Sequence, residues 1–333
     1  MLNKTSYYLG GAVLLLICAI SICATVALKN QDKEYQTLFT RYTKVFAPEI
    51  PEKAYFAGEA VPLDLYYVRE AFDREIMANT FMHSMTTMMF KRANRWFPVI
   101  EPILKKNGIP EDFKFLAIAE SNLANAVSPA GAEGYWQFIK TTGHKYGLEI
   151  NGHVDERYNM EKATQAACDY LKDAYTDFKS WTLVAASYNR GVNGLQRALD
   201  SQKVNSYYDL YLNEETSRYV YRIMAIREVY NHPAKFGFYL REQDFYPQVP
   251  VRHVMIDSSI GSLSDFARTL GVNYRILREL NPWIQDYSLP NRSGKSYIFK
   301  IPTDGGLSYE TLKKKVPKRD TFFHDTLKIS EIH

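Results

Sequence analysis

The chain has 333 residues, of which 46% are hydrophobic and 23% are charged, and its formal net charge is +4. This length is typical of about two domains, and this balance is typical of a globular protein with ample material for a core. So small a net charge gives no indication of nucleic-acid binding. We therefore predict no nucleic-acid partner.

The cysteines argue against disulfide and metal chemistry. Cys18 and Cys23 lie in an apolar N-terminal stretch, which leaves Cys168 alone in the rest of the chain. One cysteine cannot form an intramolecular disulfide, and no cysteine or histidine cluster has zinc-ligand spacing. We interpret Cys168, within the helical pattern ATQAACDYL, as a small buried apolar side chain. No metal or cofactor is predicted.

Residues 1–29 are predicted to be a transmembrane anchor or a signal. No charged residue occurs from Tyr7 to Leu28, and a helix of that length reaches roughly 33 Å, enough to cross the hydrocarbon core of a bilayer. Lys4 precedes the stretch, and positive charge on that side favours a cytoplasmic N-terminus with the remainder exported.

Two alternatives to an uncleaved anchor stay open. A signal peptide could be cleaved after Ala24 or Ala27, although the apolar run is longer than the usual core of a signal peptide. A lipoprotein signal is disfavoured because isoleucines, Ile17 and Ile22, rather than small residues precede the two cysteines. All three interpretations export the rest of the chain, so the function is expected outside the cytoplasm.

Residues 30–90 are predicted to be a helical lead-in, loosely structured over 30–62, where proline and glycine recur, and helical from Leu63 to about Lys106. The turn NGIP at 107–110 then precedes a new helix, EDFKFLAIAE. Further helices are predicted from apolar spacing and turn signals, over residues 135–146, 161–178, 181–199 and 215–230. The fold class is therefore mainly α.

A second, smaller module is predicted near the C-terminus. Residues 233–250 contain three prolines and a glycine and are interpreted as a linker. Residues 251–302 follow a strand-helix-helix-strand pattern, from VRHVMI to SYIFKIP, which predicts a small α+β module. Residues 303–333 form a charged tail.

One carboxylate stands out in the middle of the chain. Phe113, Leu116, Ala117 and Glu120 share one helical face, so a glutamate lies on an apolar stripe. Burial raises the pKa of a carboxyl group, as a general acid near neutral pH requires. From this helix alone, a structural glutamate satisfied by a hydrogen bond or an arginine is the favoured interpretation.

Further motifs follow in order, and together they are more specific than any one alone. They are Glu120-Ser121, Gly134-Tyr135-Trp136-Gln137, Ser187-Tyr188-Asn189-Arg190-Gly191 and Glu215-Thr216-Ser217-Arg218-Tyr219-Val220. On these motifs the chain resembles the lytic transglycosylases with a goose-lysozyme-like catalytic (SLT) domain, most closely the membrane-bound lytic murein transglycosylase D group. The resemblance implies a lysozyme-like all-α domain over residues 91–232.

The resemblance also implies a function. The substrate would be the glycan strands of peptidoglycan, cut between N-acetylmuramic acid and N-acetylglucosamine with formation of a 1,6-anhydro ring. Glu120 would act as acid and then as base, without metal or cofactor. Substrate would be bound by Ser121, Gln137, Tyr188, Asn189, Tyr219 and Trp136, although Trp136 and Tyr188 are open to interpretation as core residues. The protein would lie in the bacterial cell envelope, anchored by its N-terminal segment, with possible partners in wall synthesis or division.

Two other functions stay open. A muramidase would hydrolyse the same bond, but common glycosidases use two carboxylates, and the motifs supply only Glu120. Glu133 is the nearest candidate for a second, although it reads as an exposed loop residue, while Asp155 and Glu156 are expected to fix a loop or cap a helix. A non-catalytic wall-binding scaffold is the third possibility, and a glutamate on an apolar face argues against it.

Residues 251–302 resemble a LysM domain, a carbohydrate-binding module, through SLSDFARTLGVNYRILRELNP. The family's Gly-Asp-Thr near the first turn is absent, and Asp257-Ser258-Ser259-Ile260-Gly261-Ser262 stands there instead. The resemblance therefore implies the fold, while glycan binding, a spacer role and protein docking stay open as functions.

Overall fold

The computed structural model describes residues 20–21, 33–34, 36–37, 41 and 45–314. The chain divides into two compact units, Met1–Ala47 and Pro48–His333. The predicted membrane segment, Tyr7 to Leu28, lies almost wholly outside the described residues. Within the described ranges, no helix is both long and apolar enough to cross a bilayer.

The unit that begins at Pro48 is mainly helical, which confirms the predicted fold class. Its longer helices are α2 (Tyr66–Phe81), α3 (His83–Lys106), α4 (Lys114–Ser121), α5 (Lys140–Lys145), α6 (Met160–Phe178), α7 (Trp181–Arg190), α8 (Val192–Gln202), α9 (Glu214–Asn231), α10 (Leu263–Thr269), α11 (Tyr274–Leu280) and α12 (Tyr309–Lys313). Single 3-10 turns are η1 (Glu111–Phe113), η2 (Glu156–Tyr158), η3 (Tyr207–Asp209), η4 (Pro233–Phe236) and η5 (Glu242–Asp244). The strands form antiparallel pairs: β1 (Ala54–Phe56) with β2 (Glu59–Val61), β3 (Ala126–Val127) with β4 (Glu133–Gly134), and β5 (Val251–Ile256) with β6 (Tyr297–Pro302).

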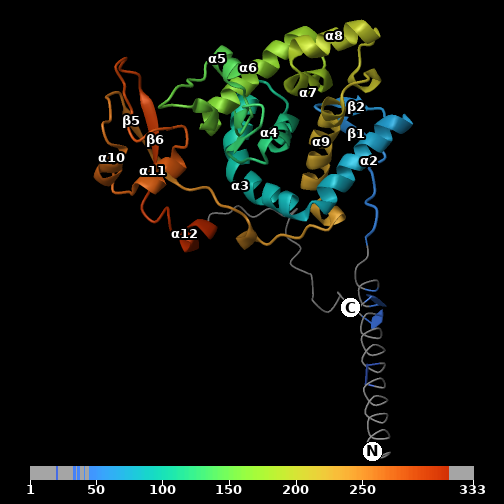
Figure 1. Cartoon of the computed structure of the whole chain (residues 1–333), viewed down its shortest axis with the longest axis horizontal. Helices are drawn as coiled ribbons and strands as arrows, with labels where there is room; N and C mark the ends of the chain where they lie inside the picture. Colours follow the sequence, from blue (N-terminus) through green and yellow to red (C-terminus); the bar gives the residue numbers. More distant parts are fainter. Residues whose placement is uncertain (1–19, 22–32, 35, 38–40, 42–44, 315–333) are drawn as a thin grey trace, which may run out of the picture. The chain divides into compact units, whose positions relative to one another are not determined.

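Helix α4 is the centre of the helical domain, with α3, α6, α7 and α9 around it (Figure 1). Its residues from Lys114 to Ile118 are all buried. The helix ends because Asn122 and Leu123 both adopt left-handed backbone conformations, with φ of 50° and 54°. Asparagine tolerates this region well. The last turn of the most buried helix therefore presents Glu120 and Ser121.

Two predicted helices were wrong in extent. The helix predicted over 135–146 begins only at Lys140, because Gly134 and Gln137 have positive φ angles of 81° and 51°. The helix predicted over 181–199 is two helices, α7 and α8, which meet at Gly191 (φ 78°). The helices predicted over 161–178 and 215–230 are confirmed within one residue at each end.

The lead-in is more ordered than predicted. Residues expected to be loosely structured form the β1–β2 hairpin. Glu59 of β2 accepts hydrogen bonds from the backbone N–H groups of Trp181 (2.5 Å) and Thr182 (3.0 Å) and from the Ser180 hydroxyl (3.0 Å). A carboxylate at this place satisfies free N–H groups at the start of α7 and interacts favourably with the helix dipole.

The segment predicted as a linker, 233–250, is packed rather than free. Phe236, Phe238, Leu240 and Phe245 are buried in the main core. The segment also accepts hydrogen bonds from α3, for instance from Asn94 Nδ2 to the Tyr246 carbonyl (3.0 Å). The connection between the two modules is therefore held along the helical domain.

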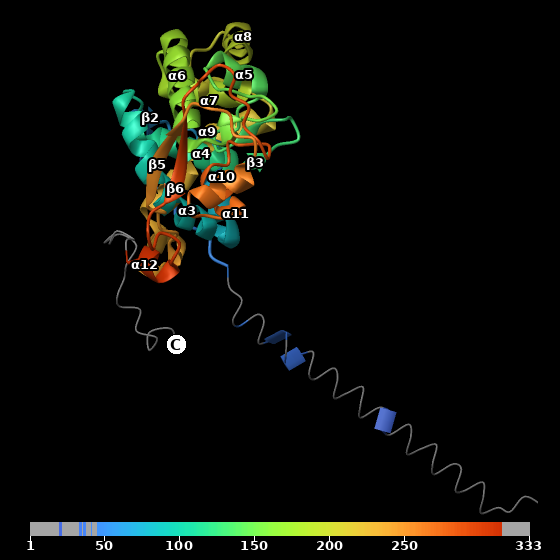
Figure 2. The same cartoon turned by 90° about the vertical axis from the view of Figure 1, so that its left-hand side faces the viewer.

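The C-terminal module follows the predicted order β5–α10–α11–β6. The strands β5 and β6 lie side by side in Figures 1 and 2 and pair in antiparallel register, from Val251 opposite Pro302 to Ile256 opposite Tyr297. A separate apolar core lies beneath them, with Leu263, Leu277 and Phe299 fully buried. The module joins the helical domain through an isolated bridge between Val154 and Ile284.

Candidate active site

The Glu120 side chain at the end of α4 is partly buried, and Leu116 and Ala117 behind it are fully buried. Its Oε1 atom accepts a hydrogen bond from the Tyr219 hydroxyl, across 99 residues of sequence. No ion pair to Glu120 occurs among the residues that the structure describes. Burial raises the pKa of its carboxyl group to about 7, against the lowering effects of the Tyr219 hydrogen bond and the charge of Arg222. Glu120 is thus poised to give and take a proton near neutrality.

Tyr219 reaches Glu120 because α9 packs along α4. Its side chain is only 2% exposed, and burial together with the neighbouring Glu120 charge raises the pKa of its hydroxyl well above the ordinary value. Tyr219 is therefore a fixed hydrogen-bond donor. It favours the ionised form of Glu120, which is the form left after the acid has given up its proton.

Tyr188 of α7 lies close to the same carboxyl group. Its hydroxyl donates to the Trp136 carbonyl (2.8 Å), and its ring packs against Tyr170 and Phe138. Burial first, and then the charge of Glu120, raise the pKa of its hydroxyl. The ring is half-buried, so Tyr188 supports the wall of the site and keeps part of its surface accessible.

Asn189 follows Tyr188 and is tied to the start of α9. Its Nδ2 donates to Glu215 Oε1 (3.0 Å), and its Oδ1 accepts from the Thr216 hydroxyl (2.8 Å). The Asn189 amide is therefore oriented by two partners. This contact joins the two motifs that contribute Tyr188 and Tyr219.

Ser121 and Gln137 hold the loop between α4 and α5. The Ser121 hydroxyl donates to the Tyr135 carbonyl (2.7 Å), while Gln137 Nε2 donates to the carbonyls of Ala126 (2.9 Å) and Gly134 (2.8 Å). Gly134 is required here, because a Cβ atom would lie 2.0 Å from the Arg157 carbonyl oxygen. The Ser121 hydroxyl, which was predicted to bind substrate, thus holds the loop that follows Glu120.

Comparison with known families identifies the two modules. Residues 97–210 match the transglycosylase SLT domain, and residues 252–305 match the soluble lytic transglycosylase C-terminal LysM-like domain. The chain contains an SLT domain followed by a LysM-like domain. The SLT match includes Glu120, Gln137 and Tyr188, while Tyr219 lies beyond it on α9.

Curated relatives agree with this assignment. Membrane-bound lytic murein transglycosylase D from Escherichia coli, in strains K12 and O6:H1, is 26% identical over 237 residues, or 69% of this chain and 51% of the relative. The chain thus spans about half the length of the curated relatives it matches. A solved structure of an inactive mutant of lytic transglycosylase Slt from Pseudomonas aeruginosa is 18% identical, covers 42% of this chain and 24% of that chain, and has a TM-score of 0.35.

One predicted substrate-binding residue of the SLT domain was wrong. Trp136 is fully buried, and its indole N–H donates to the Thr164 hydroxyl (2.9 Å). A ring with no exposed surface cannot stack on a sugar, so Trp136 is a core residue. Both interpretations of Trp136, as a sugar-binding residue and as a core residue, were open from the sequence, and its burial favours the core.

The acidic residues near the SLT motifs have distinct surroundings. Glu133 forms an ion pair with Arg157 (3.1 Å) and accepts a hydrogen bond from the Tyr158 hydroxyl (2.8 Å). Asp155 caps η2 and Glu156 accepts from the Glu149 backbone N–H (2.9 Å), as predicted. Glu215 is the acidic residue whose charge acts on Glu120, raising its pKa. In the sequence, Glu215 stands out only as the first residue of the last motif.

Among the residues that the structure describes, no group of three or more histidine, cysteine, aspartate or glutamate side chains could hold a metal ion. Cys168 is buried, as predicted. Burial raises the pKa of its thiol to about 12, which keeps the thiol protonated and unreactive.

Proposed function

We propose that the protein is a peptidoglycan lytic transglycosylase whose acid and base is Glu120. The observation that carries the proposal is the surroundings of Glu120: a partly buried carboxyl group with a pKa of about 7, a neutral tyrosine donor and no arginine partner among the described residues. The SLT match and the names of the curated relatives support the substrate class.

The first step is protonation of the leaving group. At neutral pH a large fraction of Glu120 carries its proton, which passes to the glycosidic oxygen between N-acetylmuramic acid and N-acetylglucosamine as the C1–O bond breaks. The acetamido oxygen of the muramic acid stabilises the positive charge that develops at C1. Tyr219 stabilises the Glu120 carboxylate that is left.

The second step closes the ring. The Glu120 carboxylate removes the proton from the C6 hydroxyl of the muramic acid, and the C6 oxygen bonds to C1. The products are a 1,6-anhydromuramic acid end and a free N-acetylglucosamine end. Glu120 is protonated again, and no water is consumed.

The remaining motif residues would bind and orient the sugar. The Gln137 side chain uses Nε2 within the loop, and among the described residues no hydrogen bond engages Oε1, which is suited to accept from an acetamido N–H. Asn189 is held by Glu215 and Thr216 at the neighbouring helix ends. Ser121 contributes by fixing the turn that follows Glu120.

A muramidase is the second candidate, and Glu215 is the observation that favours it. A hydrolase needs a carboxylate that can activate water or attack C1. Glu133 is engaged by Arg157 and Tyr158, whereas Glu215 is exposed and close enough for its charge to raise the Glu120 pKa. We rank this function second because Glu215 is hydrogen-bonded by Asn189.

We further propose a location in the cell envelope, with the SLT domain outside the cytoplasm. The apolar stretch from Tyr7 to Leu28 supports it, and so does the name of the relatives, which are called membrane-bound.

The test is mass spectrometry of products after digestion of purified peptidoglycan with the full chain. We expect muropeptides that end in 1,6-anhydromuramic acid, each lighter by one water than the reducing form. Reducing ends would indicate a muramidase, and Glu215→Gln would then be the next variant. If the wild type digests peptidoglycan and Glu120→Gln does so at the same rate, Glu120 is excluded as the acid.

A further inference from the structure

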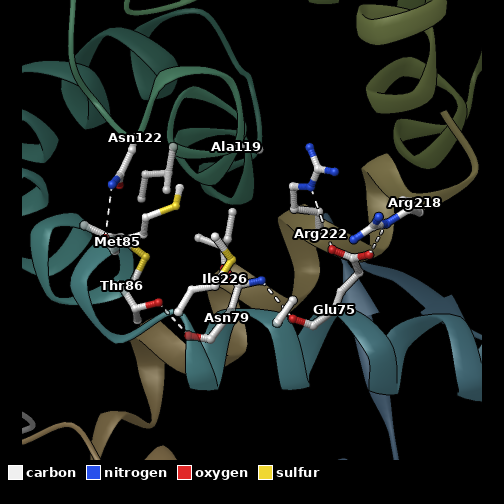
Figure 3. A pocket seen from close by; sticks show the side chains of 13 residues that line it. Glu75, Asn79, Met85, Thr86, Ala119, Asn122, Arg218, Arg222 and Ile226 are labelled. Atoms are coloured by element: carbon white, nitrogen blue, oxygen red, sulfur yellow. Dashed lines mark hydrogen bonds and ion pairs between the residues drawn. The ribbon is translucent and has the colours of Figure 1, made fainter. Parts of the chain in front are cut away.

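A pocket of about 300 Å³ lies between α2, α3, α4 and α9, next to the end of α4 that contains Glu120, which is not itself a lining residue. Ala119 and Asn122 line it from the end of α4, immediately before and shortly after Glu120 in the chain (Figure 3). Its volume is at the lower end of the range for ligand pockets, about 300–1,000 Å³. The helix α2 belongs to the lead-in, before the SLT match. This wall of the pocket therefore lies outside the region that matches the family.

The pocket has an apolar side and a cationic side. Met82, Met85 and Met89 line the first, and Met82 and Met85 are about half exposed (49% and 50%). Methionine side chains adapt to irregular ligands. Arg218 and Arg222 of α9 line the second, together with the buried carboxylate of Glu75. The pocket therefore suits a ligand that has both apolar groups and a negative charge.

The two arginines differ in how far their guanidinium donors are engaged by neighbouring residues. Arg218 donates to Glu75 (2.6 Å) and to Glu214 (3.3 Å), so its guanidinium is engaged. Arg222 contacts Glu75 only at 3.7 Å, through Nε, and donates no hydrogen bond within the part of the chain that the structure describes. Figure 3 shows its terminal nitrogens directed away from Glu75. The Arg222 side chain is 34% exposed.

Arg222 and Ala119, the chain neighbour of Glu120, both line this pocket, and the charge of Arg222 lowers the pKa of the Glu120 carboxyl group. An arginine fork with unused donors matches the two oxygens of a carboxylate. In peptidoglycan the sugar at the scissile bond carries such groups: the lactyl substituent of muramic acid ends in a carboxylate when bare, and bears a peptide with its own carboxylates when substituted.

We propose that Arg222 and this pocket form a subsite for the carboxylate-bearing substituent of the muramic acid beside the scissile bond. The proposal rests on the proposed function for its substrate. It adds a specificity-determining residue, Arg222, which selects glycans with an anionic substituent over neutral glycans of equal length.

Binding to the inactive full chain tests it without interference from turnover. In Glu120→Gln, the affinity for three glycan fragments of equal length is measured by calorimetry: one with peptide stems, one with bare lactyl carboxylates and one neutral N-acetylglucosamine oligomer. Adding Arg222→Gln should weaken binding of a carboxylate-bearing fragment roughly tenfold, as expected for a lost charge-assisted hydrogen bond. Binding of the neutral oligomer should not change, and Arg222→Lys should recover part of the loss.

The controls separate the subsite from the fold and from net charge. Glu75 keeps its 2.6 Å contact with Arg218 when Arg222 is replaced, so the variant should unfold at the same temperature as its parent. Arg241→Gln removes the same charge from a side chain that is 74% exposed in the segment before the LysM-like module, and it should leave all three affinities unchanged.

The three fragments also identify the source of the carboxylate. Loss confined to the stem-bearing fragment assigns the subsite to the peptide, and loss confined to the bare fragment assigns it to the lactyl group. Equal loss on all three fragments, or no loss on any, overturns the subsite. If the parent binds its fragments but Arg222→Gln has no effect, the subsite fails while the proposed function stands.

Discussion

Glu120 and Asp155 are both withdrawn from solvent, but they have opposite partners. Asp155 is 5% exposed and accepts from Arg157 through Nε (3.0 Å) and Nη2 (2.6 Å) and through the backbone N–H (3.0 Å). Glu120 has a hydrogen bond from the Tyr219 hydroxyl and no ion pair in the described residues. A buried carboxylate that forms an ion pair with an arginine stays ionised and fixes a loop, whereas one whose hydrogen-bond partner is neutral can hold a proton.

The surroundings of the two residues explain their separate roles. Arg157 also pairs with Glu133 and donates to the Phe138 carbonyl (3.1 Å), so Asp155 anchors the loop that contains Gln137. Glu120 ends a helix whose other residues are almost all buried. The structural carboxylate thus shapes the site, and the carboxylate that we propose to be catalytic is left without an ion pair among the described residues.

The largest expected effect is on the rate of glycan cleavage, which should differ between variants of Glu120 and Asp155. Glu120→Gln keeps an acceptor for Tyr219 but cannot transfer a proton, so the rate of glycan cleavage should fall about a thousandfold, within the range for general acid–base catalysis. The rate of release of soluble muropeptides measures it. Asp155→Asn should lower that rate far less at a temperature where it remains folded. If both variants lost cleavage activity to a comparable extent, the proposed difference between a catalytic and a structural carboxylate would be wrong.

The next largest effect is on the free energy of unfolding, which should depend on the ion pair of Asp155. Asp155→Asn removes the charge that faces buried Arg157, which should lower the free energy of unfolding by about 3 kcal/mol, toward the lower end for a broken buried pair because Glu133 still faces Arg157. Urea unfolding at neutral pH measures it. Asp265→Asn is the matched control, since Asp265 is 68% exposed and its contact with Arg268 is long, at 3.7 Å. Its replacement should change stability by less than about 0.5 kcal/mol.

Much of this contrast could be predicted from sequence, and the rest depended on tertiary contacts. The apolar stripe from Phe113 to Glu120 predicted a glutamate with a raised pKa, and its motif companions predicted Tyr188 and Tyr219. The Tyr219 hydrogen bond crosses 99 residues, and no local pattern specifies such a contact. Glu59 of the hairpin likewise caps α7 from more than 120 residues away.

The errors have physical causes as well. Trp136 was open to interpretation as a sugar-binding residue or as a core residue, and its burial depends on Thr164 of α6, which provides its hydrogen-bond acceptor. The break between α7 and α8 had a signal, Gly191, whose φ of 78° favours glycine. The spacing of apolar residues continues across Gly191 and therefore favours a single helix, although the chain forms two.

The third effect uses pH to compare wild type with Glu120→Gln. The folded state holds the Glu120 proton up to about pH 7, whereas its ordinary pKa is 4.5. The folded state therefore binds more protons than the unfolded state between these values, and wild-type stability falls as pH rises through them. The variant has no such loss, so relative to wild type it should gain up to roughly 3 kcal/mol between the two limits.

Urea unfolding of both proteins at pH values on either side of that window measures the difference. Activity should depend on the protonation of the same group. The acid must be protonated to start the reaction, so kcat/KM should decline above about pH 7. A difference in stability that stays constant with pH would mean that the folded state leaves the Glu120 pKa near its ordinary value.

The smallest expected effect comes from the removal of a single hydroxyl group, that of Tyr219. Tyr219→Phe removes the hydrogen bond that favours ionised Glu120, so the Glu120 pKa should rise and cleavage should slow roughly tenfold. The pH profile of kcat/KM measures both, with its alkaline limit displaced upward. Tyr158→Phe deletes the same chemical group, a tyrosine hydroxyl that donates to Glu133 (2.8 Å). Because Arg157 remains paired with Glu133, that control should leave the profile in place. A displaced profile in both variants would mean that Tyr219 acts on the reaction through the fold rather than through the Glu120 proton.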